Sequence, residues 1–86
     1  MLRIDRTTEG EFVVMTLSGH VALDELIGLR RLFTAEPAAT LIVDLTDVID
    51  VDREGVALLA SLESAGVRLR HCPAYVREWI TSDREG

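Results

Sequence analysis

The chain has 86 residues, of which 48% are hydrophobic and 28% are charged, a balance typical of a small globular domain and unlike that of a disordered segment. Its net charge of -6 argues against binding to nucleic acid, and its nine basic residues are all arginine, which excludes chemistry that needs a lysine, such as a P-loop or a Schiff base. The single cysteine excludes an intramolecular disulfide, and the sequence has no signal-peptide pattern and no membrane-spanning apolar run. We therefore expect one cytoplasmic domain over residues 1–86 without direct membrane insertion.

The first half of the chain predicts two strands and a helix. Residues 2–6 alternate apolar and charged side chains, and residues 11–19 are rich in β-branched residues. Because the connection between them is short, we expect an antiparallel hairpin. In residues 21–36 the apolar positions recur at helical spacing, which predicts an amphipathic helix.

The second half predicts two strands and two helices in alternation. Residues 40–45 are continuously apolar, as in a central strand covered on both faces. A helix follows from Gly55 to Gly66, a strand covers residues 67–72, and a short third helix begins after Pro73. The side chains expected to pack against the sheet are Leu29, Phe33, Leu59, Leu62 and Trp79.

The resulting order, β-β-α-β-α-β-α, predicts an α/β fold. Helical crossovers imply a mixed, mostly parallel four-stranded sheet with packed helices, edged by the N-terminal hairpin. Strand-to-helix corners gather along one edge of such a sheet, and residues 46–55 are expected to form one of them. The strand at residues 67–72 is expected at the sheet edge, where its arginines discourage open-ended pairing, so we expect a monomer or a weak homodimer.

Several motifs in this order resemble the STAS domain, the module of anti-sigma-factor antagonists and of the cytoplasmic tails of sulfate transporters. They are LSG at residues 17–19, IVDLTDV at residues 42–48, and V-D-x-x-G at residues 51–55, followed by an apolar helix. The ending CPAYVREWI, residues 72–80, is similar to that of short, stand-alone bacterial members. The resemblance implies a STAS-like fold and a binding function, with no catalytic residues, no cofactor and no metal.

The resemblance also implies that the family's phosphate switch is missing here. In switchable members, a Ser or Thr follows the Asp of the V-D-x-x-G corner, and a partner kinase phosphorylates it at the helix N-terminus. Here that position is Arg53, which cannot be phosphorylated by such a kinase, and Ala22 stands where those members often have Asp. The corner is therefore predicted to be a partner-binding surface without a switch, formed by Asp50, Asp52, Arg53, Glu54 and Val56.

A non-enzymatic regulatory module of this kind binds a protein partner. The resemblance favours an anti-sigma or kinase-type regulator as that partner. The alternative is an accessory regulatory subunit of a membrane transport ATPase, and a small ligand-binding or anion-binding domain is the weaker hypothesis. A small enzyme would need a nucleophile, a base or a cofactor loop, and no motif in the sequence supplies one.

The acids of the corner allow another interpretation, as a metal site or a phosphoacceptor like that of response regulators. A receiver-type site needs an acidic pair after the first strand and a later lysine, both of which are absent, and hard cations need convergent oxygens. A solvated acidic loop, with Asp52 capping the second helix, is the simpler hypothesis. The acids concerned are Asp44, Asp47, Asp50, Asp52 and Glu54.

The remaining polar residues have structural as well as functional interpretations. Arg53 either contacts a partner or pairs with neighbouring acids, and Thr46 either accepts phosphate or serves turn chemistry. His20 and His71 have no motif-placed nucleophile beside them, and Cys72 closes an apolar strand, so we expect structural roles for all three.

Overall fold

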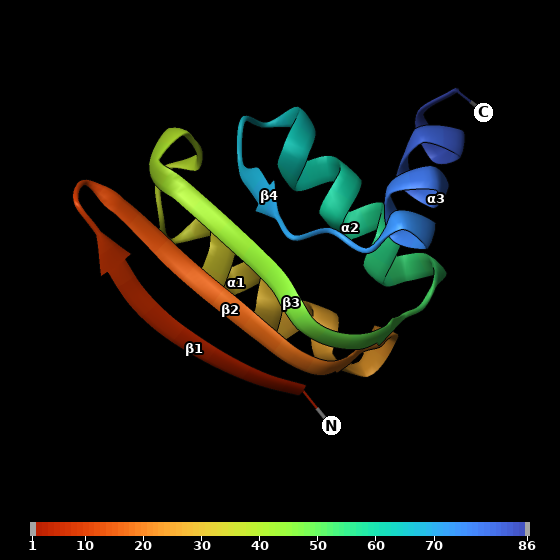
Figure 1. Cartoon of the computed structure of the whole chain (residues 1–86), viewed down its shortest axis with the longest axis horizontal. Helices are drawn as coiled ribbons and strands as arrows, with labels where there is room; N and C mark the ends of the chain where they lie inside the picture. The colour runs from red at the N-terminus through yellow and green to blue at the C-terminus, as the bar shows by residue number, and fades with distance from the viewer. Residues whose placement is uncertain (1, 86) are drawn as a thin grey trace.

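The computed structural model describes residues 2–85, and at residues 23 and 83–85 it describes the backbone only. The predicted order β-β-α-β-α-β-α is confirmed (Figure 1). Short 3-10 helices at Leu23–Glu25 and Ala38–Thr40 precede the first α-helix and the third strand. The main elements are β1 (Leu2–Glu9), β2 (Phe12–Val21), α1 (Leu26–Thr34), β3 (Leu41–Val51), α2 (Arg53–Ser64), β4 (Arg68–Arg70) and α3 (Ala74–Glu85).

The four strands form one sheet in the order β1-β2-β3-β4. β1 pairs with β2 antiparallel, whereas β2 with β3 and β3 with β4 are parallel, so the predicted mixed sheet is confirmed. Both parallel connections step the same way along the sheet, and right-handed crossovers then place α1 and α2 on the same face (Figure 1). No helix of the described residues 2–85 covers the opposite face of the sheet.

The core lies between the sheet and this helix layer. Leu41, Val43 and Leu45 alternate toward the helices and are fully buried, as the pleat of a strand requires. From the helices, the predicted Leu29, Phe33, Leu59 and Leu62 are buried, together with Val76 and Ile80 of α3. In the described part of the chain, no helix is long and apolar enough to cross a membrane.

The prediction that Trp79 belongs to the core is wrong, because its exposed fraction is 39%. Val76 and Ile80 are four residues apart and occupy the inward face of α3. Trp79 is four residues from Tyr75 instead, and this pair lies on the outward face of the helix.

Two element boundaries differ from the sequence prediction at the place where the corner was expected. β2 extends to Val21 and β3 to Val51, and these two residues are register partners. Residues 46–51 are therefore strand and not loop, although their acids suggested a turn. The extra strand length follows from pairing with β2, whose register shifts between Thr16 and Ser18 and again between Gly19 and His20. At the sheet edge, β4 has only three residues where six were predicted.

Candidate interaction surface at the end of β3

The turn from β3 into α2 is fixed by Asp52. Its carboxylate oxygen Oδ1 accepts a hydrogen bond of 2.8 Å from the Gly55 N–H, so it caps the helix as the sequence predicts. The backbone N–H of Asp52 also donates to the carbonyl of Val21 at 3.1 Å. The start of α2 is thereby tied to the end of β2.

Gly55 has no room for a side chain. A Cβ at this position would lie 2.8 Å from Cγ1 of Val51 and 2.9 Å from the carbonyl oxygen of Val21. The spacing V-D-x-x-G thus has a physical explanation. The aspartate caps the helix, and the glycine lets the first helical turn pack directly on the ends of β2 and β3.

The predicted partner-binding residues differ in how exposed they are at this turn. Asp50, Arg53 and Glu54 are exposed, and Asp52 is half-buried. Val56 is 1% exposed, so its assignment to the surface is wrong. It faces the core because it follows Gly55 on the side of α2 that packs on the sheet, in line with Leu59.

Exposed apolar side chains gather at the same end of the molecule. Ile49, near the end of β3, is 69% exposed, and Tyr75 of α3 is 46% exposed. The Tyr75 hydroxyl donates to the carbonyl of Ile49 over a long contact of 3.5 Å, which places the start of α3 beside the end of β3. Together with Trp79, these residues form what we call the corner patch: Ile49, Tyr75 and Trp79.

Sequence reasoning did not find the corner patch as a unit. Ile49 lies among acids, where its apolar character gives no periodic signal, and Tyr75 is 26 residues away. A usable signal was the spacing of four between Tyr75 and Trp79, which places two aromatic rings on one face of a helix.

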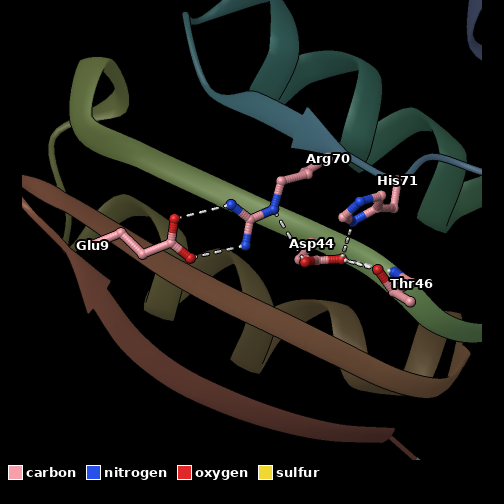
Figure 2. A network of polar contacts seen from close by, with 5 residues as sticks. All are labelled: Glu9, Asp44, Thr46, Arg70 and His71. Atoms are coloured by element: carbon pink, nitrogen blue, oxygen red, sulfur yellow. Dashed lines mark hydrogen bonds and ion pairs between the residues drawn. The ribbon is translucent and has the colours of Figure 1, made fainter.

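A second cluster lies on the helix-free face of the sheet and is polar (Figure 2). Asp44 points to this face because its neighbours Val43 and Leu45 point into the core. Arg70 of β4 donates from Nε to Oδ2 of Asp44 at 3.1 Å. Its two terminal nitrogens bind the Glu9 carboxylate at 3.2 and 3.1 Å, so one guanidinium spans from β4 over β3 and β2 to the end of β1.

The second oxygen of Asp44 is saturated by other donors. Oδ1 accepts hydrogen bonds from the Thr46 N–H at 2.9 Å and from the Thr46 hydroxyl, and it lies 3.2 Å from Nδ1 of His71. Burial raises the pKa of Asp44, but the bonds from Thr46, His71 and Arg70 outweigh it and hold the pKa at about 2. The carboxylate is therefore ionised at neutral pH, too weak a base for proton transfer, and already engaged on both oxygens.

His71 reaches Asp44 through an unusual backbone conformation. Its φ of 56° lies in the left-handed region, which ends the strand alternation after Arg70. Arg70 and His71 consequently both approach Asp44, while Cys72 returns to pack against the core. The strand predicted over residues 67–72 therefore ends before His71 and Cys72.

The other candidate residues have structural surroundings. Cys72 is half-buried, and burial raises the pKa of its thiol, which makes the reactive thiolate scarcer. His20 is exposed at the end of β2, where its register partner is Asp50. Among the side chains that the structure describes, no group of three or more His, Cys, Asp or Glu is arranged to hold a metal ion.

Comparison with known proteins identifies the fold and no family. No family model and no curated protein matches the chain. A crystal structure of Mglu is similar over 81% of this chain, with a TM-score of 0.64 and 22% sequence identity. A structure of Mglu in its native form in 4.3 M NaCl matches 76% of this chain and 25% of that one, with 19% identity and a TM-score of 0.43.

The chain spans 19% of the length of the first Mglu structure. At this level of identity the likeness shows a similar fold over the matched part of this chain. It carries nothing about function.

Proposed function

We propose that this chain is a STAS-like, non-enzymatic regulatory module that binds a protein partner through the end of β3 and the adjoining helices. The STAS-like order of elements and the V-D-x-x-G turn support the family assignment. In that turn Asp52 caps α2, and Gly55 permits the close approach of the helix to the sheet.

The observation that carries the proposal is the corner patch. Tyrosine and tryptophan are over-represented among the residues that dominate binding energy at protein interfaces, and here both are exposed on α3, whose Tyr75 contacts Ile49. Exposed charges at Asp50, Arg53 and Glu54 follow directly in the chain. An apolar centre with a charged rim is the usual arrangement of a protein-binding surface.

Regulation of this surface by a kinase on the corner itself is not expected. Arg53 is the first residue of α2 and is exposed where switchable STAS domains carry a hydroxyl. The nearby Thr46 hydroxyl donates to Asp44, so phosphorylation there would break the polar cluster and bring negative charge beside a carboxylate. We therefore propose binding without the phosphate switch.

Two kinds of protein partner fit this proposal. An anti-sigma or kinase-type regulator is the first, and a membrane transport ATPase that uses this chain as an accessory subunit is the second. A ligand-binding or anion-binding domain is the weaker alternative. A thermal shift on addition of ATP, common metals or phosphate would favour it, because a ligand of the native state must stabilise that state.

The proposal is tested by quantitative affinity capture from the native lysate, with variants of the bait. We expect Ile49→Asp and Trp79→Ser to lower recovery of a specific partner about tenfold or more, because they remove the apolar centre of the surface. Leu32→Asp is the matched control, since Leu32 is also apolar and exposed but belongs to α1. Equal recovery by the corner variants and the parent would show that the corner patch is not the interface.

A further inference from the structure

The outer side of α1 carries a groove of about 330 Å³ that the corner patch does not include. All of its lining residues come from this one helix: Leu26, Ile27, Arg30, Arg31 and Thr34. Ile27 is 75% exposed, the highest value among the exposed large apolar side chains of the described residues. On the other side of the same helix, Leu29 and Phe33 are buried in the core.

The spacing of the lining residues identifies the groove as one between two ridges of the helix. Leu26, Arg30 and Thr34 are four residues apart and form one ridge, and Ile27 and Arg31 form the next. Such i±4 grooves accept the side-chain ridges of a second helix. Because all of the described lining residues belong to α1, a helix laid along α1 can contact the whole groove.

The charges of the groove indicate the chemistry of that helix. Arg6, Arg70 and Arg77 each pair with a carboxylate, whereas no ion pair of Arg30 or Arg31 is present among the described side chains. Both arginines are exposed on a chain whose net charge is -6. The groove is therefore a local basic and apolar surface on an acidic protein, complementary to carboxylates placed around an apolar stripe.

We propose that this groove binds an amphipathic α-helix of a partner protein, with its apolar side on Leu26 and Ile27 and its carboxylates facing Arg30 and Arg31. The nine residues of α1 are about 14 Å long, which matches two to three turns of the bound helix. The acids Asp24 and Glu25 precede α1, so the carboxylates of the bound helix lie toward the other end of the groove, near the arginines.

This second surface is separate from the one proposed above. The groove belongs to α1, whereas Tyr75 and Trp79 of the corner patch belong to α3, and α2 packs against both of these helices (Figure 1). A domain with two chemically different surfaces can hold two partners together. The groove does not depend on the proposed function, and either surface can fail its test alone.

The test uses the whole chain and a helix-stabilised synthetic peptide of about 15 residues, with leucines along one face and glutamates on the others. A ¹⁵N NMR titration should give saturable shifts centred on the amides of Leu26, Ile27, Arg30, Arg31 and Thr34. The same peptide with lysine in place of glutamate should bind about tenfold more weakly or worse. Shifts centred on the corner patch or on β1, or equal binding of the lysine peptide, would overturn the proposal.

Matched variants separate a specific groove from general charge attraction. Arg30→Glu with Arg31→Glu should weaken binding about tenfold or more, whereas Arg3→Glu with Arg68→Glu, at exposed positions on β1 and β4, changes the net charge equally and should weaken it less than about twofold. Equal weakening by both pairs would contradict the proposal. Sedimentation velocity tests whether a second copy of this chain fills the groove instead. A dimer of the parent chain that becomes a monomer in the Ile27→Asp variant would show that it does, and the proposal would then be wrong.

Discussion

Arg70 and Asp44 are 26 residues apart in the sequence, yet Nε of Arg70 donates to Oδ2 of Asp44 at 3.1 Å. They are register partners on neighbouring parallel strands. Because β4 has only three residues, the main-chain ladder alone holds this edge strand weakly. The side-chain hydrogen bonds from Arg70 to Asp44 and Glu9 thus stabilise the attachment of β4 to the rest of the sheet (Figure 2).

The first prediction concerns the acceptor of this cluster. Asp44→Asn should lower the free energy of unfolding by about 2 to 4 kcal/mol, because Arg70 loses a carboxylate and at least one donor to the buried Asp44 side chain is left without an acceptor. Urea denaturation measures the change. Asp47→Asn, on an exposed position of the same strand, is the control and should change stability by less than about 0.5 kcal/mol.

The pKa of Asp44 predicts how stability depends on pH. Folding lowers this pKa from 3.8 to about 2, so the unfolded chain binds more protons between these values. The contribution of about 2 kcal/mol is fully present above pH 4 and is lost as the pH falls from about 4 to 2. The lowered pKa of Glu9, caused by its bonds to Arg70, acts in the same direction.

Urea midpoints measured across this acid range check the pH prediction. The parent should lose stability more steeply than Asp44→Asn, since the variant lacks the titrating group. Parallel curves for the two proteins would show that Asp44 does not carry the effect.

Substitution by alanine should change the free energy of unfolding in opposite directions at two glycines, Gly55 and Gly28. Gly55→Ala should destabilise the chain by about 1 to 3 kcal/mol, because the new Cβ meets Val51 and the carbonyl of Val21 within 3 Å. Gly28, in α1, has no such neighbour within 4 Å, and Gly28→Ala should stabilise by up to about 1 kcal/mol through helix propensity. Thermal melting of both variants distinguishes a steric role of Gly55 from a general effect of removing glycine.

The burial pattern predicts different outcomes for two large apolar residues. Leu59→Ala or Leu62→Ala should cost about 2 to 5 kcal/mol, enough to unfold a domain of this size. Trp79→Ala should cost less than Leu59→Ala because the indole is partly exposed. Circular dichroism at increasing temperature measures each loss. A variant of Leu59 that melts like the parent would contradict the observed packing.

The last prediction concerns the missing hydroxyl at the corner. An anti-sigma-type kinase with ATP should leave the mass of the chain unchanged, and phosphate on Thr46 would contradict this. Arg53→Ser supplies an acceptor but should still not be recognised, since Ala22 and the remaining surface differ from the switchable pattern. Arg53→Glu should weaken partner binding without lowering the melting temperature, because Arg53 is exposed at the first turn of α2.

The sequence alone determined the features that depend on neighbours in the chain. The apolar run before Asp44 predicted the central strand, and helical spacing placed Leu29, Phe33, Leu59 and Leu62 inward. The capping role of Asp52 was also predictable, because an N-cap acts over only three residues. Side-chain periodicity and capping are local, so the order of residues is sufficient to reveal them.

Only the tertiary structure decided which distant residues meet. Glu9 and Arg70 are 61 residues apart, and the strand order and register that bring them together over Asp44 leave no periodic trace in the sequence. The same holds for Ile49 and Tyr75 at the corner. The exposed position of Trp79 and the extension of β3 to Val51 likewise depended on how one segment packs against or pairs with another. Such pairing is set by the packing of the whole sheet and not by the local pattern of any one segment.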